Sequence, residues 1–137
     1  MLKVKDLMSK KIDFVMPDAT IEDVAKIMEK SDVGIVPVCD EDKKLLGVIT
    51  DRDIVLRKIA KNRGNIKVED IMTTRLTTAS PNESIYDISK IMAKHKIRRI
   101  PIVEDNNRLV GIISIADIAV NKEFDMEVSQ AISEISK

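Results

Sequence analysis

The chain repeats itself along almost its whole length. When the 137-residue sequence is shifted by 64 positions, residues 4–59 align with residues 68–123 without a gap, and 17 of the 56 aligned positions are identical. A stacked solenoid needs about three copies to bury its faces, so two copies favour a pair of similar units packed on each other. The repeat therefore predicts the architecture before any single motif is considered.

Both repeats predict the same order of elements. Apolar residues at spacings of three and four mark the helices, and short aliphatic runs separated by polar turns mark the strands. The elements of the first and second repeats are, in order, a helical turn (4–8 and 68–72), an extended stretch (11–15 and 75–79), a helix capped by Thr20 and Ser84, a strand (35–39 and 99–103), a second strand (45–49 and 109–113) and a helix from Thr50 and Ser114. The predicted fold class is α/β or α+β.

These elements divide the chain into residues 1–64, a first domain with its linker, residues 65–123, a second domain, and residues 124–137, a helical tail. The basic stretch 61–67 contains Gly64 and suits a surface crossing. In the tail an apolar stripe falls at Phe124, Val128, Ile132 and Ile135. We expect this stripe to pack on its own module or on a second subunit.

The composition argues against several classes of function. Its 23 basic and 23 acidic residues give no net charge, and aromatic residues are scarce, which disfavours nucleic-acid binding. No apolar run reaches the ~20 residues of a membrane helix, and no secretory signal is visible, so we expect a cytoplasmic protein. Cys39 is the only cysteine and His95 the only histidine, which excludes a metal site built from cysteines or histidines, and we expect no metal. We expect Cys39 to be a small apolar residue in a strand.

One motif stands at the junction of strand and helix in both repeats. The sequence reads GVITDRDI at residues 47–54 and GIISIADI at residues 111–118. A hydroxyl followed three residues later by a carboxylate has the outline of a capping box. The same groups could hold a ligand, because a carboxylate can accept both hydroxyls of a ribose. The glycine in each strand indicates a close approach to the backbone. The two interpretations are compatible.

The full order of motifs, written twice in register, resembles the CBS domain, and the tandem resembles a Bateman module over residues 4–123. The resemblance implies two β-α-β-β-α units whose three-stranded sheets pack face to face around a pseudo-twofold axis. It also implies that adenosine compounds (AMP, ADP, ATP or S-adenosylmethionine) bind in two clefts, with the motif Asp on the ribose and the motif Ser or Thr on ribose or phosphate.

Carried onto this chain, the resemblance implies two sets of ligand-binding residues. The first comprises Thr50, Asp53, Ile12, Asp13, Val15, Ile35, Val36 and Pro37. The second comprises Ser114, Asp117, Leu76, Thr77, Ala79, Arg99, Ile100 and Pro101. Arg98, Arg99 and Arg52 are candidates for phosphate contacts, because a guanidinium matches phosphate oxygens. The second cleft is the better nucleotide site, since Asp51 and Asp53 make the first one acidic.

The expected function is that of a regulatory module, not an enzyme. No phosphate loop, dinucleotide fingerprint or nucleophile elbow is present, and no base, nucleophile and oxyanion donors occur together. We therefore expect no catalytic cofactor and an adenosine nucleotide as ligand. We expect the module to transmit whether ligand is bound, either to an effector protein or to its own homodimer interface. The alternatives are a structural dimerisation module without ligand and, less favoured, a nucleic-acid-binding protein.

Overall fold

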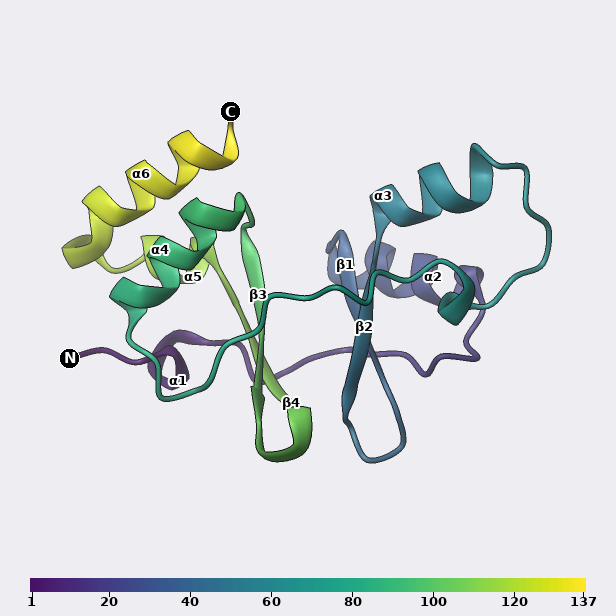
Figure 1. Cartoon of the computed structure of the whole chain (residues 1–137), viewed down its shortest axis with the longest axis horizontal. Helices are drawn as coiled ribbons and strands as arrows, with labels where there is room; N and C mark the ends of the chain where they lie inside the picture. The colour runs from purple at the N-terminus through teal and green to yellow at the C-terminus, as the bar shows by residue number, and fades with distance from the viewer. The chain divides into compact units, whose positions relative to one another are not determined.

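The computed structural model describes residues 1–137 and contains both helices and strands (Figure 1). The helices are α1 (Val4–Leu7), α2 (Ile21–Ser31), α3 (Asp51–Asp53), α4 (Ile85–His95), α5 (Ile115–Ala119) and α6 (Asp125–Ile135). The strands are β1 (Ile35–Cys39), β2 (Leu45–Thr50), β3 (Arg99–Glu104) and β4 (Arg108–Ser114). A π-helix, η1 (Ile54–Ile59), continues α3, and the 3-10 turns are η2 (Val68–Asp70), η3 (Asp105–Asn107) and η4 (Lys122–Phe124). The two predicted strands that follow the long helix of each repeat, and the mixed fold class, are confirmed.

The predicted caps begin the two long helices of the repeats. The Thr20 hydroxyl accepts a hydrogen bond from the backbone N–H of Asp23 at 3.1 Å, and α2 follows. The Ser84 hydroxyl accepts one from the N–H of Asp87 at 3.1 Å, and α4 follows. Each hydroxyl satisfies an N–H that has no partner within its own helix, which fixes where the helix begins.

The sheets are smaller than expected. β1 pairs with β2 and β3 pairs with β4, while the extended stretches 11–15 and 75–79 each contribute one bridging residue, Val15 beside Val38 and Ala79 beside Ile102. The expectation of three full strands was therefore wrong. Pro37 explains the short ladder: its carbonyl accepts from Val15 N–H at 3.0 Å, and its nitrogen, on the same side of the strand, has no hydrogen to donate. Pro101 repeats this against Ala79.

The leading segment of each repeat packs on the other repeat. Val4 N–H donates to the Glu83 carbonyl at 2.9 Å, and Val68 N–H donates to the Ala19 carbonyl at 2.9 Å. Consequently one compact unit, unit 1, consists of Met1–Ile12, Thr77–Asp105 and Leu109–Lys137. The other, unit 2, consists of Asp13–Leu76 and Asn106–Arg108. The compact units thus differ from the repeats as they run along the sequence.

Each unit has an aliphatic core that includes the exchanged segment. In unit 1 the core contains Val4, Ile85, Ile88, Met92, Ile100, Ile102, Ile113 and Ile118. In unit 2 it contains Val15, Val24, Val36, Val38, Ile49, Val68 and Ile71. Because Val4 and Val68 are fully buried, the exchange is part of the core and not a surface contact.

The tail forms α6, which packs on α4 of its own unit. Val128 and Ala131 are buried, whereas Ile132 is exposed, so the predicted stripe was partly wrong. The buried face follows Val128 and Ala131, which belong to the same core cluster as Ile88 and Met92 of α4. At the positions that match Ser89 and Ala93, the first repeat has Ala25 and the charged Glu29.

Candidate functional site

Both strand–helix junctions form a complete capping box. At the first, the Thr50 hydroxyl accepts from Asp53 N–H at 3.0 Å, and the Asp53 carboxylate accepts from Thr50 N–H at 3.0 Å. At the second, the corresponding distances for Ser114 and Asp117 are 3.2 and 2.9 Å. The capping interpretation of the repeated motif is therefore confirmed, and the two junctions differ only in what surrounds them.

At the first junction the carboxylate of Asp53 is enclosed by its own unit. The hydroxyl of Thr73 lies 3.1 Å from both carboxylate oxygens and donates to them. The guanidinium of Arg57 forms an ion pair with the same carboxylate, with Nε 3.6 Å from Oδ1. Asp53 is only 7% exposed. Cap, hydroxyl and guanidinium together satisfy the hydrogen-bonding capacity that a buried carboxylate requires.

Arg57 also connects η1, in which it lies, to the residues that follow η2 by hydrogen bonds. Its Nη1 atom donates to the carbonyl of Ile71 at 3.1 Å and to that of Met72 at 3.3 Å. Thr73, the next residue, pairs with Val48 of β2 through two backbone hydrogen bonds of 2.8 and 2.9 Å. The enclosure of Asp53 is thus built by the exchanged segment, which joins the two repeats.

At the second junction the carboxylate of Asp117 is more open. One of its oxygens caps the backbone of Ser114, the other has no hydrogen-bond partner in the structure, and the residue is half-buried. Ser9 and Asn121 occupy the positions that match Thr73 and Arg57, but their side chains bond elsewhere. Ser9 donates to the Lys11 carbonyl at 3.4 Å, and Asn121 accepts from Glu123 N–H at 3.2 Å.

The glycines of the motif allow the exchanged segments to approach. A Cβ atom on Gly47 would lie 2.7 Å from the backbone carbonyl oxygen of Thr73. On Gly111 it would lie 2.5 Å from the Met8 sulfur and 3.0 Å from the Ser9 carbonyl oxygen. The predicted close approach is therefore present, and the partner is the chain itself. These contacts account for the glycines without a ligand.

Unit 1 contains the residues predicted for the second cleft except Leu76, which belongs to unit 2, and several of them lie near one edge of its sheet. Ile115 N–H donates to the Arg98 carbonyl at 2.9 Å, which places the start of β3 beside the helix that begins after Ser114. Arg98 is exposed, Arg99 and Thr77 are half-buried, and the side chains of Ala79, Ile100 and Pro101 are buried.

The residues predicted for the first cleft are more scattered. Val36 and Pro37 are buried in unit 2, and Asp13 accepts a hydrogen bond from the Ser31 hydroxyl at 2.8 Å. Arg52 is exposed, and its backbone N–H donates to the Asp51 carboxylate at 2.8 Å. Ile12 belongs to unit 1.

Thr73 and Arg57 were missed at the level of sequence. The spacing of four between Asp53 and Arg57 is a signal for a helical ion pair and could have indicated that contact. Thr73 lies twenty residues from Asp53, and only the exchange of segments brings it close. Nothing in the sequence near Asp53 points to it.

Other reactive groups add no second site. Cys39 is fully buried, and burial raises the pKa of its thiol to about 11, which agrees with the predicted role as a small apolar residue. No three side chains of His, Cys, Asp or Glu gather as metal ligands would. None of the helices combines the length and the apolar character that crossing a membrane requires.

The sequence was compared with known proteins and structures. The model of the CBS domain matches residues 4–59 and again residues 68–121. The CBS domain-containing protein YhcV of Bacillus subtilis (strain 168) is 42% identical over 137 residues, covering 99% of this chain and 96% of YhcV. Inosine-5'-monophosphate dehydrogenase of the same organism is 40% identical over 114 residues, but these cover only 22% of the enzyme.

A similar solved structure is the CBS domain pair of protein MJ0100, in complex with 5'-methylthioadenosine and S-adenosyl-L-methionine. It is 34% identical to this chain, with a TM-score of 0.77, and the match covers 88% of this chain and 94% of that one. Both repeats of this chain therefore have counterparts in a characterised family.

Proposed function

This chain belongs to the CBS domain family, and on that basis we propose that it is a regulatory module that binds an adenosine compound at the second strand–helix junction. The observation that carries the proposal is the unpaired carboxylate oxygen of Asp117, which lies at a capped helix start beside Arg98 and Arg99 at the beginning of β3. The first junction offers no equivalent acceptor, since Asp53 is enclosed.

The groups at the second junction match the parts of a nucleotide. A carboxylate oxygen that is half-exposed can accept hydrogen bonds from the two ribose hydroxyls, and such charged hydrogen bonds are the stronger kind. The Ser114 hydroxyl can serve ribose or phosphate. The guanidinium groups of Arg98 and Arg99 can bind phosphate oxygens in pairs. Thr77, which is half-buried, would border the base, and Ala79, Ile100 and Pro101 would lie behind it.

The bound ligands of a related protein support the ligand class. The CBS pair of MJ0100 binds 5'-methylthioadenosine and S-adenosylmethionine, which share the adenosine group and carry no phosphate. The two arginines of this chain favour a phosphorylated member of the class, such as AMP or ATP. These are metabolites of the cytoplasm, the expected location.

The proposed output is regulatory. The similarity to inosine-5'-monophosphate dehydrogenase covers a small part of that enzyme, so it does not extend catalysis to this chain. A ligand changes a conformational equilibrium only by its different affinity for the two states. We propose that binding biases the arrangement of this chain toward one that an effector protein or a second subunit recognises.

Calorimetric titration with AMP, ATP, S-adenosylmethionine and 5'-methylthioadenosine tests the proposal. Asp117→Ala removes the ribose acceptor and should cost about 1.5–3 kcal/mol, which is roughly a 10- to 100-fold loss of affinity. The matched control is Asp87→Ala, because Asp87 also lies three residues after a capping serine in unit 1. Equal affinity in wild type and Asp117→Ala would refute the ribose assignment. Failure of all four compounds to bind would favour the ligand-free alternative.

Arg99→Ala tests the phosphate contact separately. The variant should lose more affinity for ATP than for 5'-methylthioadenosine, since only ATP carries the phosphates. An equal loss for both would assign Arg99 to a role other than phosphate binding.

A further inference from the structure

The exchanged segment of each repeat docks on its unit through matching backbone hydrogen bonds. We call residues 2–9 the strap of unit 1 and residues 66–73 the matching segment of unit 2. Ser9 pairs with Ile112 of β4 through bonds of 2.8 and 3.0 Å. Thr73 pairs in the same way with Val48 of β2, through bonds of 2.8 and 2.9 Å. Because these backbone contacts are alike, the side chains decide which segment is held more firmly.

Side chains hold the matching segment in place through bonds that the strap lacks. Arg57 donates to two carbonyls of the matching segment, at 3.1 and 3.3 Å. The Thr73 hydroxyl donates to the buried carboxylate of Asp53. Unit 1 has Asn121 and Ser9 at the corresponding positions, and their side chains bond elsewhere.

The strap also buries less apolar surface than the matching segment. Val4 and Val68 are both fully buried, but Leu7 is half-buried where Ile71 is only 1% exposed. Buried apolar surface and hydrogen bonds both contribute to the free energy of docking. A segment held by fewer such contacts opens locally at a lower cost in free energy. The strap is therefore the more easily opened of the two segments.

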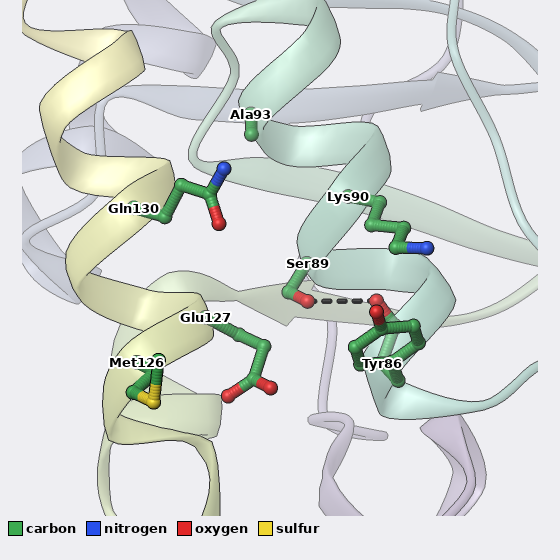
Figure 2. A pocket seen from close by; sticks show the side chains of 7 residues that line it. All are labelled: Tyr86, Ser89, Lys90, Ala93, Met126, Glu127 and Gln130. Atoms are coloured by element: carbon green, nitrogen blue, oxygen red, sulfur yellow. Dashed lines mark hydrogen bonds between the residues drawn. The ribbon is translucent and has the colours of Figure 1, made fainter.

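The remainder of unit 1 has contacts that do not involve the strap. The helices α4 and α6 lie side by side (Figure 2), and Val128 and Ala131 of α6 share a core cluster with Met92 of α4. Near the start of α4 the Ser89 hydroxyl donates to the Tyr86 carbonyl at 2.7 Å, as the dashed line in Figure 2 shows. These contacts can keep α4 in place when the strap is open, so the opening does not require unit 1 to unfold.

We propose that the strap opens while the rest of unit 1 stays folded, and that ligand at the second junction closes it. Opening uncovers the core around Val4 and the backbone of Ile112, which an effector protein can recognise as the ligand-free state. The ligand dependence rests on the proposed function, whereas the weaker hold on the strap does not.

The position of Ser9 connects the strap to the ligand. Ile112, its partner in β4, lies two residues before the hydroxyl that caps the second junction. The Ser9 hydroxyl matches that of Thr73, which reaches the carboxylate of the first junction. It makes a long bond of 3.4 Å to the Lys11 carbonyl, which rotation of the side chain can exchange for a ribose oxygen held by Asp117. Only a closed strap offers this contact, so closure and ligand binding strengthen each other by the same factor.

Hydrogen exchange of backbone amides, followed by NMR without ligand, tests the hold on the strap. Relative to intrinsic rates, the amides of Val4 and Ser9 should exchange roughly tenfold or more faster than those of Val68 and Thr73. Amides in the middle of α4 should exchange far more slowly than the strap, because the opening is local. Equal exchange in the two segments, or strap amides as slow as those of α4, would overturn the proposal.

Arg57→Asn gives unit 2 the residue that unit 1 has at this position. Exchange at Val68 and Thr73 should then rise by roughly tenfold, because two hydrogen bonds to the matching segment are lost. The matched control is Arg52→Asn, since Arg52 is an exposed arginine of α3, and it should leave this exchange unchanged. Unchanged exchange in Arg57→Asn, or an equal rise in the control, would overturn the assigned difference in hold.

The same amides, measured with saturating AMP or 5'-methylthioadenosine, test the ligand dependence. Either compound, once calorimetry shows that it binds, should slow exchange at Val4 and Ser9 by roughly fivefold or more and leave Val68 and Thr73 unchanged. Ser9→Ala should lower the affinity by roughly three- to tenfold and reduce this slowing. Binding that leaves the strap amides unchanged would overturn ligand closure while the proposed function stands. If neither compound binds, the proposed function fails and ligand closure with it, whereas the ligand-free rates still decide whether the strap opens.

Discussion

The two strand–helix junctions have the same motif and the same capping geometry, yet their carboxylates have different surroundings. Asp53 is surrounded by Thr73 and Arg57, whereas Asp117 keeps one oxygen unpaired. The matching residues of the second repeat, Ser9 and Asn121, direct their side chains to other partners. The duplicated motif thus stabilises the fold through the enclosed Asp53 carboxylate in the first repeat. In the second repeat it leaves an oxygen of Asp117 available as a hydrogen-bond acceptor.

The difference follows from neighbours outside the motif. Threonine and arginine reach the Asp53 carboxylate from the exchanged segment and from the next helical turn, so the carboxylate can be buried without an unsatisfied charge. In the second repeat the Ser9 hydroxyl donates to the Lys11 carbonyl and asparagine is shorter than arginine, so the Asp117 carboxylate stays partly in solvent. The comparison makes predictions about the stability of matched pairs of variants.

The largest expected difference concerns the two carboxylates themselves. Asp53→Ala removes the cap, leaves Thr73 and Arg57 without their acceptor and should lower the free energy of unfolding by about 3 kcal/mol. Asp117→Ala loses one partly buried capping bond and should cost about 1 kcal/mol or less. Urea denaturation of both variants measures the difference. Equal costs would show that the enclosure of Asp53 contributes nothing to stability.

A second comparison uses the two motif glycines. Gly47→Ala places a Cβ atom against the backbone of Thr73, which cannot move without breaking the pairing with β2, so it should cost about 2 kcal/mol. Gly111→Ala mainly meets the flexible end of Met8, and its cost should stay below about 1 kcal/mol. Thermal denaturation compares them, and a reversed order would contradict the assigned contacts.

A third pair isolates the hydroxyl donors. Thr73→Val keeps the shape of the side chain, removes the donor to a buried carboxylate and should cost about 1.5 kcal/mol. Ser9→Ala removes an exposed hydroxyl, and its effect should lie within about 0.5 kcal/mol of zero. If both variants were as stable as wild type in urea, the hydrogen bond from Thr73 to Asp53 would contribute nothing to stability.

The smallest expected effect is at Cys39, where the second repeat has Val103. Cys39→Val keeps the position apolar and should change stability by less than about 1 kcal/mol. In the wild type the raised pKa, about 11, keeps the thiol protonated at pH 8. Because the thiolate is the reactive form, a thiol reagent should label Cys39 only after unfolding. Rapid labelling of the native protein would contradict its burial.

Much of the fold could be predicted from the sequence because its signals are local. Residue patterns over two to four positions predict the caps Thr20 and Ser84, the four strands and both capping boxes. The short sheets could also have been anticipated from Pro37 and Pro101, since a proline in a strand withholds a donor from one neighbour.

The rest depended on contacts between distant segments. The exchange of Val4 and Val68 between repeats, and with it the enclosure of Asp53, joins residues that no local pattern relates. The buried face of α6 was misjudged because Ala131, a small residue, packs where Ile132 was expected. Packing into the core of unit 1, beside Ile88 and Met92 of α4, selected that face, and hydrophobicity alone could not reveal it.

The most direct test of the different roles of the two junctions is the number of ligands that one chain binds. Calorimetric titration with the tightest-binding adenosine compound should give one site per chain, which Asp117→Ala removes and Asp53→Asn retains in the folded protein. Two sites per chain, one of them lost in Asp53→Asn, would show that both carboxylates bind ligand and would contradict this account.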